Sequence, residues 1–177
     1  MCVGAANSTA FQQGRARAAR RRRPGSDDRY TAATMADPSA RVVPHLPKPR
    51  GAYPHFRRAG DFIFVSGIGA RRADNTIAGA TSDAMGTTVL DIRAQTRAAL
   101  DNVRAVLDAA GATLADVVDI VAFLVDMADF GSYNEVYAEY FGADGPARTT
   151  LAVHQLPHPH MRIEVKAVAW KPAGGES

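Results

Sequence analysis

Cysteine is almost absent from this 177-residue chain, because Cys2 is its only one. One cysteine near the N-terminus excludes a disulfide framework, a multi-cysteine zinc site and a cysteine nucleophile in the body of the chain. Such usage is typical of a reducing compartment, so we expect a cytoplasmic location. No run of about 18 apolar residues occurs either, which predicts no membrane-spanning segment and no membrane partner.

Motifs for nucleotide binding and nucleophilic catalysis are also missing. No glycine-rich phosphate loop follows a predicted strand, and no serine lies in a glycine elbow. The three histidines between His154 and His160, with Glu164 nearby, are the best metal-like cluster. Their spacing is not a strong ligand spacing, and two prolines make the segment extended and irregular. We therefore predict no metal site, and expect these histidines to supply loop polarity or to contact an anionic ligand.

Positive charge is concentrated at the N-terminus. Residues 1–40 contain seven arginines and three aspartates, for a net +4, whereas residues 41–177 contain 14 basic and 15 acidic side chains, for a net −1. The larger part therefore carries no nucleic-acid footprint, and we predict no nucleic-acid partner. Residues 1–40 lack apolar periodicity, which predicts a disordered basic tail. A transit peptide and a nucleic-acid-binding arm are alternatives for this tail, and Met35 is the predicted natural start.

Residues 41–172 are predicted to form one domain, followed by a flexible C-terminus at 173–177. Hydrophobic periodicity and turn residues place seven elements in it. In chain order they are a hairpin of strands at 53–58 and 62–66, a helix at 91–110, a strand at 117–125, a helix at 130–141, and strands at 148–154 and 163–170. Residues 71–88 are predicted as a long loop with at most one short strand. This order favours an α/β (α+β) fold with one mixed sheet and two helices on one face, and the bare face predicts self-association.

The last two strands carry the charges of most interest. Arg148 and Thr150 share one face of their strand, while Glu164 and Lys166 point away from the apolar face of theirs. An arginine early in one strand and a glutamate early in the next predict a site that holds a carboxylate and moves a proton. A structural ion pair, or two solvated charges, is the alternative.

Several short blocks in combination resemble the RidA (YjgF) family of enamine/imine deaminases over about residues 42–172. They are Gly51–Tyr53, Phe64–Gly67, Ala110–Gly111, Asp116–Val118, Phe123–Phe130, Tyr133–Tyr137 and Pro146–Thr150. Within that family, three segments resemble 2-aminomuconate deaminases. They are Arg71–Thr76, Asp91–Arg97 and His154–His160.

The resemblance implies a chorismate-mutase-like fold and a homotrimer with active sites between subunits. It implies a small carboxylate substrate and no cofactor. The family's carboxylate-binding arginine falls on Arg148, its acid/base glutamate on Glu164, and the tyrosine of its first glycine-containing motif on Tyr53. These three are the predicted catalytic residues.

Further residues of the matching blocks are predicted to contact substrate, namely Ser66, Gly67, Asn134 and Thr150. Two positions depart from the family pattern. Ile68 stands where typical members carry Gln, and Thr150 stands where many carry Cys. These departures favour a specialised pocket over the general substrate range of the family.

The predicted reaction is hydrolytic deamination of an enamine or imine carboxylate, with 2-aminomuconate giving 4-oxalocrotonate and ammonia. Its second carboxylate needs another cation or donor, and the candidates are Arg71, Arg72, His158 and His160, with the two histidines favoured. A general 2-iminoacid deaminase is the first alternative. A non-catalytic trimer that binds small carboxylates as a regulator is the second.

Overall fold

The computed structural model describes residues 39–172, all of which belong to the unit Met35–Ser177. The tail predicted at 1–40, except for its last two residues, and the C-terminus predicted to be flexible lie outside the described residues. Within residues 39–172 no helix combines the length and the hydropathy needed to cross a bilayer.

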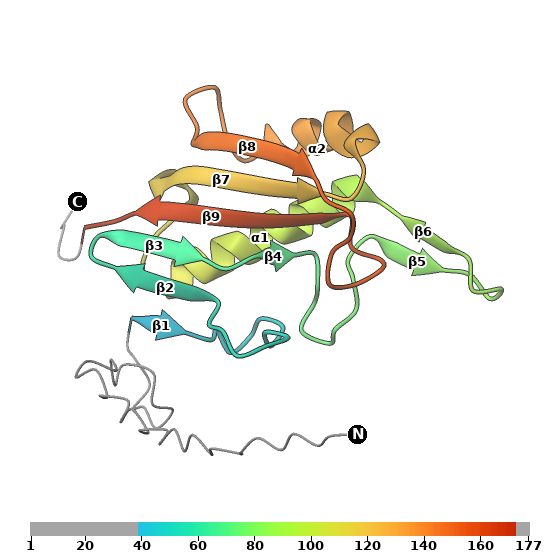
Figure 1. Cartoon of the computed structure of the whole chain (residues 1–177), viewed down its shortest axis with the longest axis horizontal. Helices are drawn as coiled ribbons and strands as arrows, with labels where there is room; N and C mark the ends of the chain where they lie inside the picture. The colour runs from blue at the N-terminus through green and yellow to red at the C-terminus, as the bar shows by residue number, and fades with distance from the viewer. Residues whose placement is uncertain (1–38, 173–177) are drawn as a thin grey trace, which may run out of the picture. The chain divides into compact units, whose positions relative to one another are not determined.

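A seven-stranded mixed sheet forms the centre of this unit (Figure 1). Its strand order is β1-β2-β3-β9-β7-β8, and β4 pairs with β9 beside this path. The strands are β1 Ala40–Arg41, β2 Phe56–Ala59, β3 Phe62–Val65, β4 Ile68–Gly69, β7 Val117–Leu124, β8 Ala147–Ala152 and β9 Ile163–Trp170. Only β7 and β8 are parallel among these pairs, so β8 is reached by a crossover through the second helix.

Strict alternation in β9 explains why one face of the sheet carries the core. Ile163, Val165, Ala167 and Ala169 are fully buried, whereas the residues between them are half-buried or exposed. Successive strand side chains point to opposite faces, so every second residue of this central strand faces the helices.

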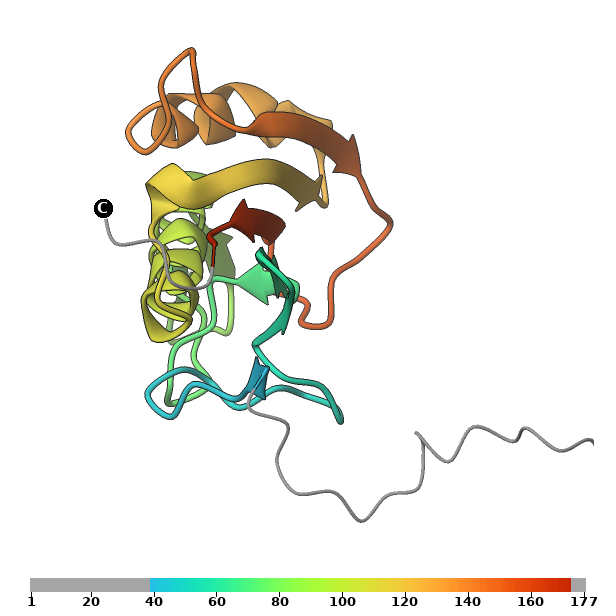
Figure 2. The same cartoon turned by 90° about the vertical axis from the view of Figure 1, so that its left-hand side faces the viewer.

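Two α-helices cover that face (Figure 2). Helix α1 (Ile92–Ala109) begins where the Asp91 carboxylate accepts the N–H groups of Arg93 and Ala94. It packs against β9 and β4, and α2 (Phe130–Tyr137) packs against α1. Short 3₁₀ turns, η2 (Leu114–Asp116) and η3 (Met127–Asp129), precede β7 and α2. The predicted α+β fold, one mixed sheet with two helices on one face, is confirmed.

The structure corrects several predicted elements, including the strand predicted at 148–154, which ends at Ala152. The first hairpin strand begins at Phe56, so Tyr53 lies in the preceding loop. The second helix ends at Tyr137 rather than at residue 141. The long loop contains a complete two-stranded ribbon, formed by β5 (Ala80–Ser82) and β6 (Thr88–Leu90), where at most one strand was expected.

Among residues 39–172 no element covers the face of the sheet opposite the helices, and this face exposes several large apolar side chains. Phe62 and Phe64 on β3, Leu151 on β8 and Trp170 on β9 expose 44%, 42%, 38% and 48% of their surface. Their register places Phe62 beside Trp170, so the aromatic side chains form one patch. We call this surface the open face.

Candidate functional site

Arg148 lies on the helix-covered face of the sheet. Its partner in the parallel register of β7 and β8 is Ile120, which is fully buried against the helices. The guanidinium carbon is 4.4 Å from the centre of the Tyr137 ring and 5.3 Å from that of the Tyr133 ring. These tyrosines are one helical turn apart on α2, so their rings together support the guanidinium by cation–π contacts.

Buried hydroxyl groups surround Arg148. Within residues 39–172 the hydroxyl oxygens of Tyr133, Tyr137 and Thr150 form no hydrogen bond of normal geometry. The Tyr133 hydroxyl nevertheless lies near enough to Thr150 and Arg148 for both side chains to act on its pKa. Burial raises the pKa of Tyr133, and burial together with Tyr133 raises the pKa of Tyr137 to about 12. Both phenols therefore keep their protons at neutral pH, and each can donate to a ligand or to water.

A hollow of about 420 Å³ opens beside Arg148. We call it the Arg148 hollow; it is lined by Asn134, Tyr137, Ala138, Phe141, Gly142, Ala143, Gly145, Pro146 and Arg148. The predicted residues Arg148 and Asn134 thus meet here, and Thr150 lies two positions further along β8 on the same face. No ion pair to Arg148 is present among residues 39–172, so its fork of donors is available for a carboxylate.

Glu164 lies on the opposite face of the sheet. Its neighbours Ile163 and Val165 are fully buried, so Glu164 points away from the core. It lines a groove of about 530 Å³. We call this the Glu164 groove; it is formed by Tyr53, Pro54, Arg57, Phe64, Val65, Ser66, Gly67, Pro157, Glu164 and Lys166.

Close packing against a glycine holds the Glu164 carboxyl. A Cβ atom added to Gly67 would lie 2.2 Å from Glu164 Oε1, so the carboxyl rests where a side chain at position 67 would be. Burial raises the pKa of Glu164 above its ordinary value of 4.5. A carboxyl group of raised pKa is suited to exchanging protons near neutral pH.

Two other predicted residues have different roles in the groove. Tyr53 is 46% exposed and stands at the rim, where it can contact a ligand. Ser66 donates from its hydroxyl to the Pro54 carbonyl at 2.7 Å. Because this bond uses the hydroxyl proton, Ser66 fixes the loop that carries Tyr53, and its lone pairs remain for a ligand.

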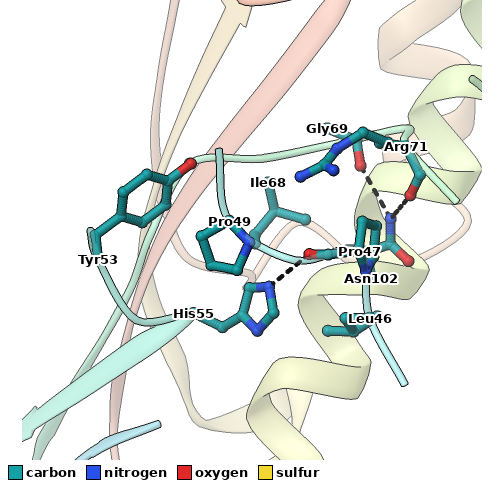
Figure 3. A pocket seen from close by; sticks show the side chains of 10 residues that line it. Leu46, Pro47, Pro49, Tyr53, His55, Ile68, Gly69, Arg71 and Asn102 are labelled. Atoms are coloured by element: carbon teal, nitrogen blue, oxygen red, sulfur yellow. Dashed lines mark hydrogen bonds between the residues drawn. The ribbon is translucent and has the colours of Figure 1, made fainter. Parts of the chain in front are cut away.

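A smaller pocket adjoins the groove and shares Tyr53 and Gly67 with it (Figure 3). We call it the Arg71 pocket; it is lined by Leu46, Pro47, Pro49, Tyr53, His55, Gly67, Ile68, Gly69, Arg71 and Asn102. In Figure 3 the Arg71 guanidinium points to the side of the pocket where Tyr53 lies. The predicted candidate Arg71 is therefore next to the groove, whereas Arg72 is exposed and bonded to Thr76 and to the Ile77 carbonyl.

Buried polar residues that the sequence analysis did not single out shape this pocket. His55 accepts the Val43 N–H at Nδ1 (2.8 Å), so its Nε2 donates to the Pro47 carbonyl (3.0 Å). Burial lowers the pKa of His55, and the ring is a neutral structural group. Asn102 on α1 donates to the carbonyls of Gly69 and Arg71 at 3.0 and 3.1 Å. Their partners are backbone groups of other segments, 8 to 33 residues away in the chain, so no local motif signals these roles.

The loop that carries His158 and His160 is tied to α1 through Gln95. This side chain is fully buried; it donates to the His160 carbonyl at 2.7 Å and accepts the Arg162 N–H at 2.8 Å. The two histidine rings lie edge to face with centres 5.1 Å apart, and Pro157 of the same loop lines the Glu164 groove. Within residues 39–172 no group of three or more His, Cys, Asp or Glu is arranged to hold a metal ion.

One chain does not bring Arg148 and Glu164 together. Arg148 lies level with Ile120 on the helix side of β7, and Glu164 lies level with Phe123 on the open side. The Arg148 hollow and the Glu164 groove are therefore two separate half-sites. A small molecule that contacts both groups must lie between the hollow of one chain and the groove of another.

Comparison with known proteins agrees with this architecture. The model of the family described as endoribonuclease L-PSP matches residues 43–171. A RutC family protein of Pyrococcus horikoshii is 42% identical over 127 residues, which cover 72% of this chain and 93% of the relative. The 3-aminoacrylate deaminase RutC of Acinetobacter baylyi is 35% identical over 133 residues, covering 75% of this chain and 98% of the relative.

A solved structure shows the same fold. The crystal structure of the YjgF gene product from E. coli superposes with a TM-score of 0.62 at 30% identity, and the match covers 74% of this chain and 97% of that one. The resemblance to RidA (YjgF) proteins is therefore confirmed, and the chain belongs to the endoribonuclease L-PSP family.

Proposed function

We propose that this protein hydrolyses enamine or imine carboxylates to oxo acids and ammonia, at sites that form between the subunits of a homotrimer. The observation that carries the proposal is the pair of complementary half-sites on opposite faces of one sheet. One offers an arginine fork that forms no ion pair within residues 39–172, and the other offers a half-buried carboxyl of raised pKa. A relative of 35% identity is named a 3-aminoacrylate deaminase, which supports this reaction class.

Arg148 has the role of binding the carboxylate next to the C–N bond. Its planar guanidinium can form two parallel hydrogen bonds to one carboxylate, and the Tyr133 and Tyr137 rings restrict its rotation. Fixing the carboxylate fixes the adjacent reacting carbon, which converts binding energy into positioning. Thr150 and Asn134, on the same face, supply further polar contacts.

Glu164 has the role of moving protons. An enamine first gains a proton at carbon and loses one from nitrogen to give an imine, and water then adds to the imine carbon. Glu164 takes a proton from this water and returns one to the nitrogen, so that the C–N bond breaks and ammonia leaves as the carbonyl forms. The sum is enamine plus water giving oxo acid plus ammonia, with no oxidant and no cofactor. Tyr53 at the rim closes the groove or donates a hydrogen bond to the substrate.

The finer substrate assignment that we propose is 2-aminomuconate, which has two carboxylates. The departure from the family pattern at Ile68 and the histidine-containing loop at the groove support a specialised pocket. A general 2-iminoacid deaminase is the alternative, which is favoured by a relative from Dermatophagoides farinae that is 32% identical over 128 residues and is named a 2-iminobutanoate/2-iminopropanoate deaminase. Ammonia release from 2-aminomuconate and from 2-iminopropanoate, measured side by side, separates these substrates.

The catalytic assignment is tested by Arg148→Ala. We expect it to reduce ammonia release from either substrate by at least about a thousandfold, because both carboxylate binding and positioning are lost. The trimer should persist, as measured by light scattering after size exclusion. Wild-type protein that binds carboxylates but releases no ammonia would instead support the non-catalytic regulator, and an Arg148→Ala variant with full activity would remove the assignment.

A further inference from the structure

We propose that Arg50 and Arg71 form an anion-binding subsite at the end of the Glu164 groove, which takes the second carboxylate of a dicarboxylate substrate. This inference rests on the proposed function, because it places the first carboxylate at Arg148 of a neighbouring subunit. Arg50 had no role in the sequence analysis. We call this pair the Arg50–Arg71 subsite.

Hydrogen bonds anchor two arginines from separate segments beside the groove. Arg50, in the loop before β2, donates to the Pro157 carbonyl at 3.2 Å. Arg71, just after β4, donates to the Lys48 carbonyl at 2.6 Å and to Asn75 Oδ1 at 2.7 Å. These three bonds use a minority of the ten N–H groups that two guanidiniums carry, so donors remain for a ligand.

The subsite lacks a compensating acid. Among residues 39–172, neither Arg50 nor Arg71 forms an ion pair, whereas Arg93, Arg97, Arg104 and Arg162 each contact a carboxylate. His158 lies close enough to both guanidiniums that they lower its pKa, after the larger effects of burial and of His160. Burial and then the charge of Arg50 lower the pKa of Arg71. Positive groups held together in this way bind an anion favourably, because the anion relieves their mutual repulsion.

The position of the subsite matches an extended substrate. Tyr53 and Gly67 line both the Arg71 pocket and the Glu164 groove, and Pro157, which accepts from Arg50, lines the groove as well. A ligand whose reacting carbon lies at Glu164 would pass Tyr53 and Gly67 to reach the Arg71 pocket. We expect a six-carbon dicarboxylate to place its second carboxylate there, whereas 2-iminopropanoate has no second carboxylate to place.

Two non-reacting ligands of equal length test the subsite by calorimetry. Muconate and sorbate share a six-carbon diene chain, and muconate alone has the second carboxylate. We expect wild-type protein to bind muconate at least about tenfold more tightly than sorbate, which is the effect of a charge-assisted hydrogen bond. Arg50→Gln and Arg71→Gln should each reduce the ratio of muconate to sorbate affinity severalfold. The double variant should bring this ratio close to one. Arg71→Lys, which keeps the charge, should keep part of the preference.

Arg104→Gln is the matched control, because Arg104 is an exposed arginine on α1 that pairs with Asp101 and lines none of these sites. The ratio of muconate to sorbate affinity in Arg104→Gln should equal that of the wild-type protein. Equal losses of muconate and sorbate affinity in the Arg50 and Arg71 variants would show a structural role and overturn the subsite. A wild-type ratio near one would overturn it directly.

Turnover then separates this inference from the proposed function. If both are right, Arg50→Gln lowers kcat/KM for 2-aminomuconate severalfold more than for 2-iminopropanoate. If the wild-type protein prefers muconate but deaminates neither substrate, the subsite stands and the proposed function fails. If the wild-type protein deaminates both substrates and Arg50→Gln lowers kcat/KM by the same factor for each, the proposed function stands and the subsite is wrong.

Discussion

Burial is the one cause that raises the pKa of Glu164, so the position of this side chain determines its pKa. Gly67 makes this position available, since any side chain there would collide with the carboxyl. The sequence predicted both residues through family resemblance, and the alternation of β9 correctly pointed Glu164 away from the core. His55 and Arg50 could not be found in this way, because they bond to backbone carbonyls of Pro47 and Pro157, and such partners leave no pattern in the sequence.

The raised pKa of Glu164 predicts an acid limb in the pH profile of kcat/KM. Only the ionised carboxylate can take a proton from water, so activity should fall as the pH decreases through the pKa of Glu164, above the ordinary value of 4.5. Glu164→Gln should lose this limb and about 100- to 10,000-fold in kcat. An unchanged acid limb in the residual activity of Glu164→Gln would assign the titration to another group.

Stability provides the control for this variant. A carboxyl whose pKa is higher in the folded than in the unfolded state contributes most to stability below the unfolded pKa, and this contribution is lost as the pH rises through the folded pKa. Ionised Glu164 is therefore a cost at neutral pH, which Gln removes. The midpoint of thermal unfolding at pH 7 should not decrease in Glu164→Gln, so a loss of activity cannot be ascribed to unfolding.

Whole elements were predicted well where a local pattern determines them. The Asp91 cap and the helical spacing of apolar residues predicted α1. The alternation of apolar and polar residues predicted β9. The ribbon of β5 and β6 was missed because Ala80, Ser82 and Thr88 have no strong strand pattern. The structure shows that they pair through cross-strand contacts, including one between the Ser82 and Thr88 hydroxyls at 2.8 Å. β4 was missed because the two glycines around Ile68 indicated a turn, whereas the Met161 side chain packs against Gly69 in the structure.

Gln95 joins helix α1 to the loop before β9, and its replacement tests that connection. In Gln95→Leu the His160 carbonyl and the Arg162 N–H both lose their partner inside the protein. We expect the free energy of unfolding to fall by about 2–4 kcal/mol, since unpaired buried polar groups are costly. Urea denaturation at fixed protein concentration measures it, and hydrogen exchange at the Arg162 amide should become faster.

Thr96→Val is the control on the same helix. Thr96 is equally buried, but its hydroxyl donates to the Ile92 carbonyl within α1, which the helix already bonds through its backbone. Its effect should be about 1 kcal/mol or less, with unchanged exchange at Arg162. Equal destabilisation by both variants would show that Gln95 acts only through local packing.

At the scale of the whole molecule, the proposed homotrimer explains both the open face and the separation of the Arg148 hollow from the Glu164 groove. Phe62, Phe64, Leu151 and Trp170 leave an apolar surface that a second chain can cover. The same association can bring the Arg148 hollow of one subunit to the Glu164 groove of the next. Sequence reasoning gave the residue types and their strands, but the separation of the half-sites depends on the β7–β8 and β7–β9 registers, which no pattern in the chain encodes.

Mixing two inactive variants tests the shared site directly. In a trimer of randomly combined Arg148→Ala and Glu164→Gln chains, a site is complete when its arginine comes from a Glu164→Gln subunit and its glutamate from an Arg148→Ala subunit. About a quarter of the sites meet this condition for an equal mixture with closed three-fold symmetry. Co-refolding the two variants should therefore restore about a quarter of wild-type ammonia release, while each variant refolded alone stays inactive. A site built within one chain would lack one of the two groups in every subunit, so a mixture that forms trimers and remains inactive would rule out the division of the site between subunits.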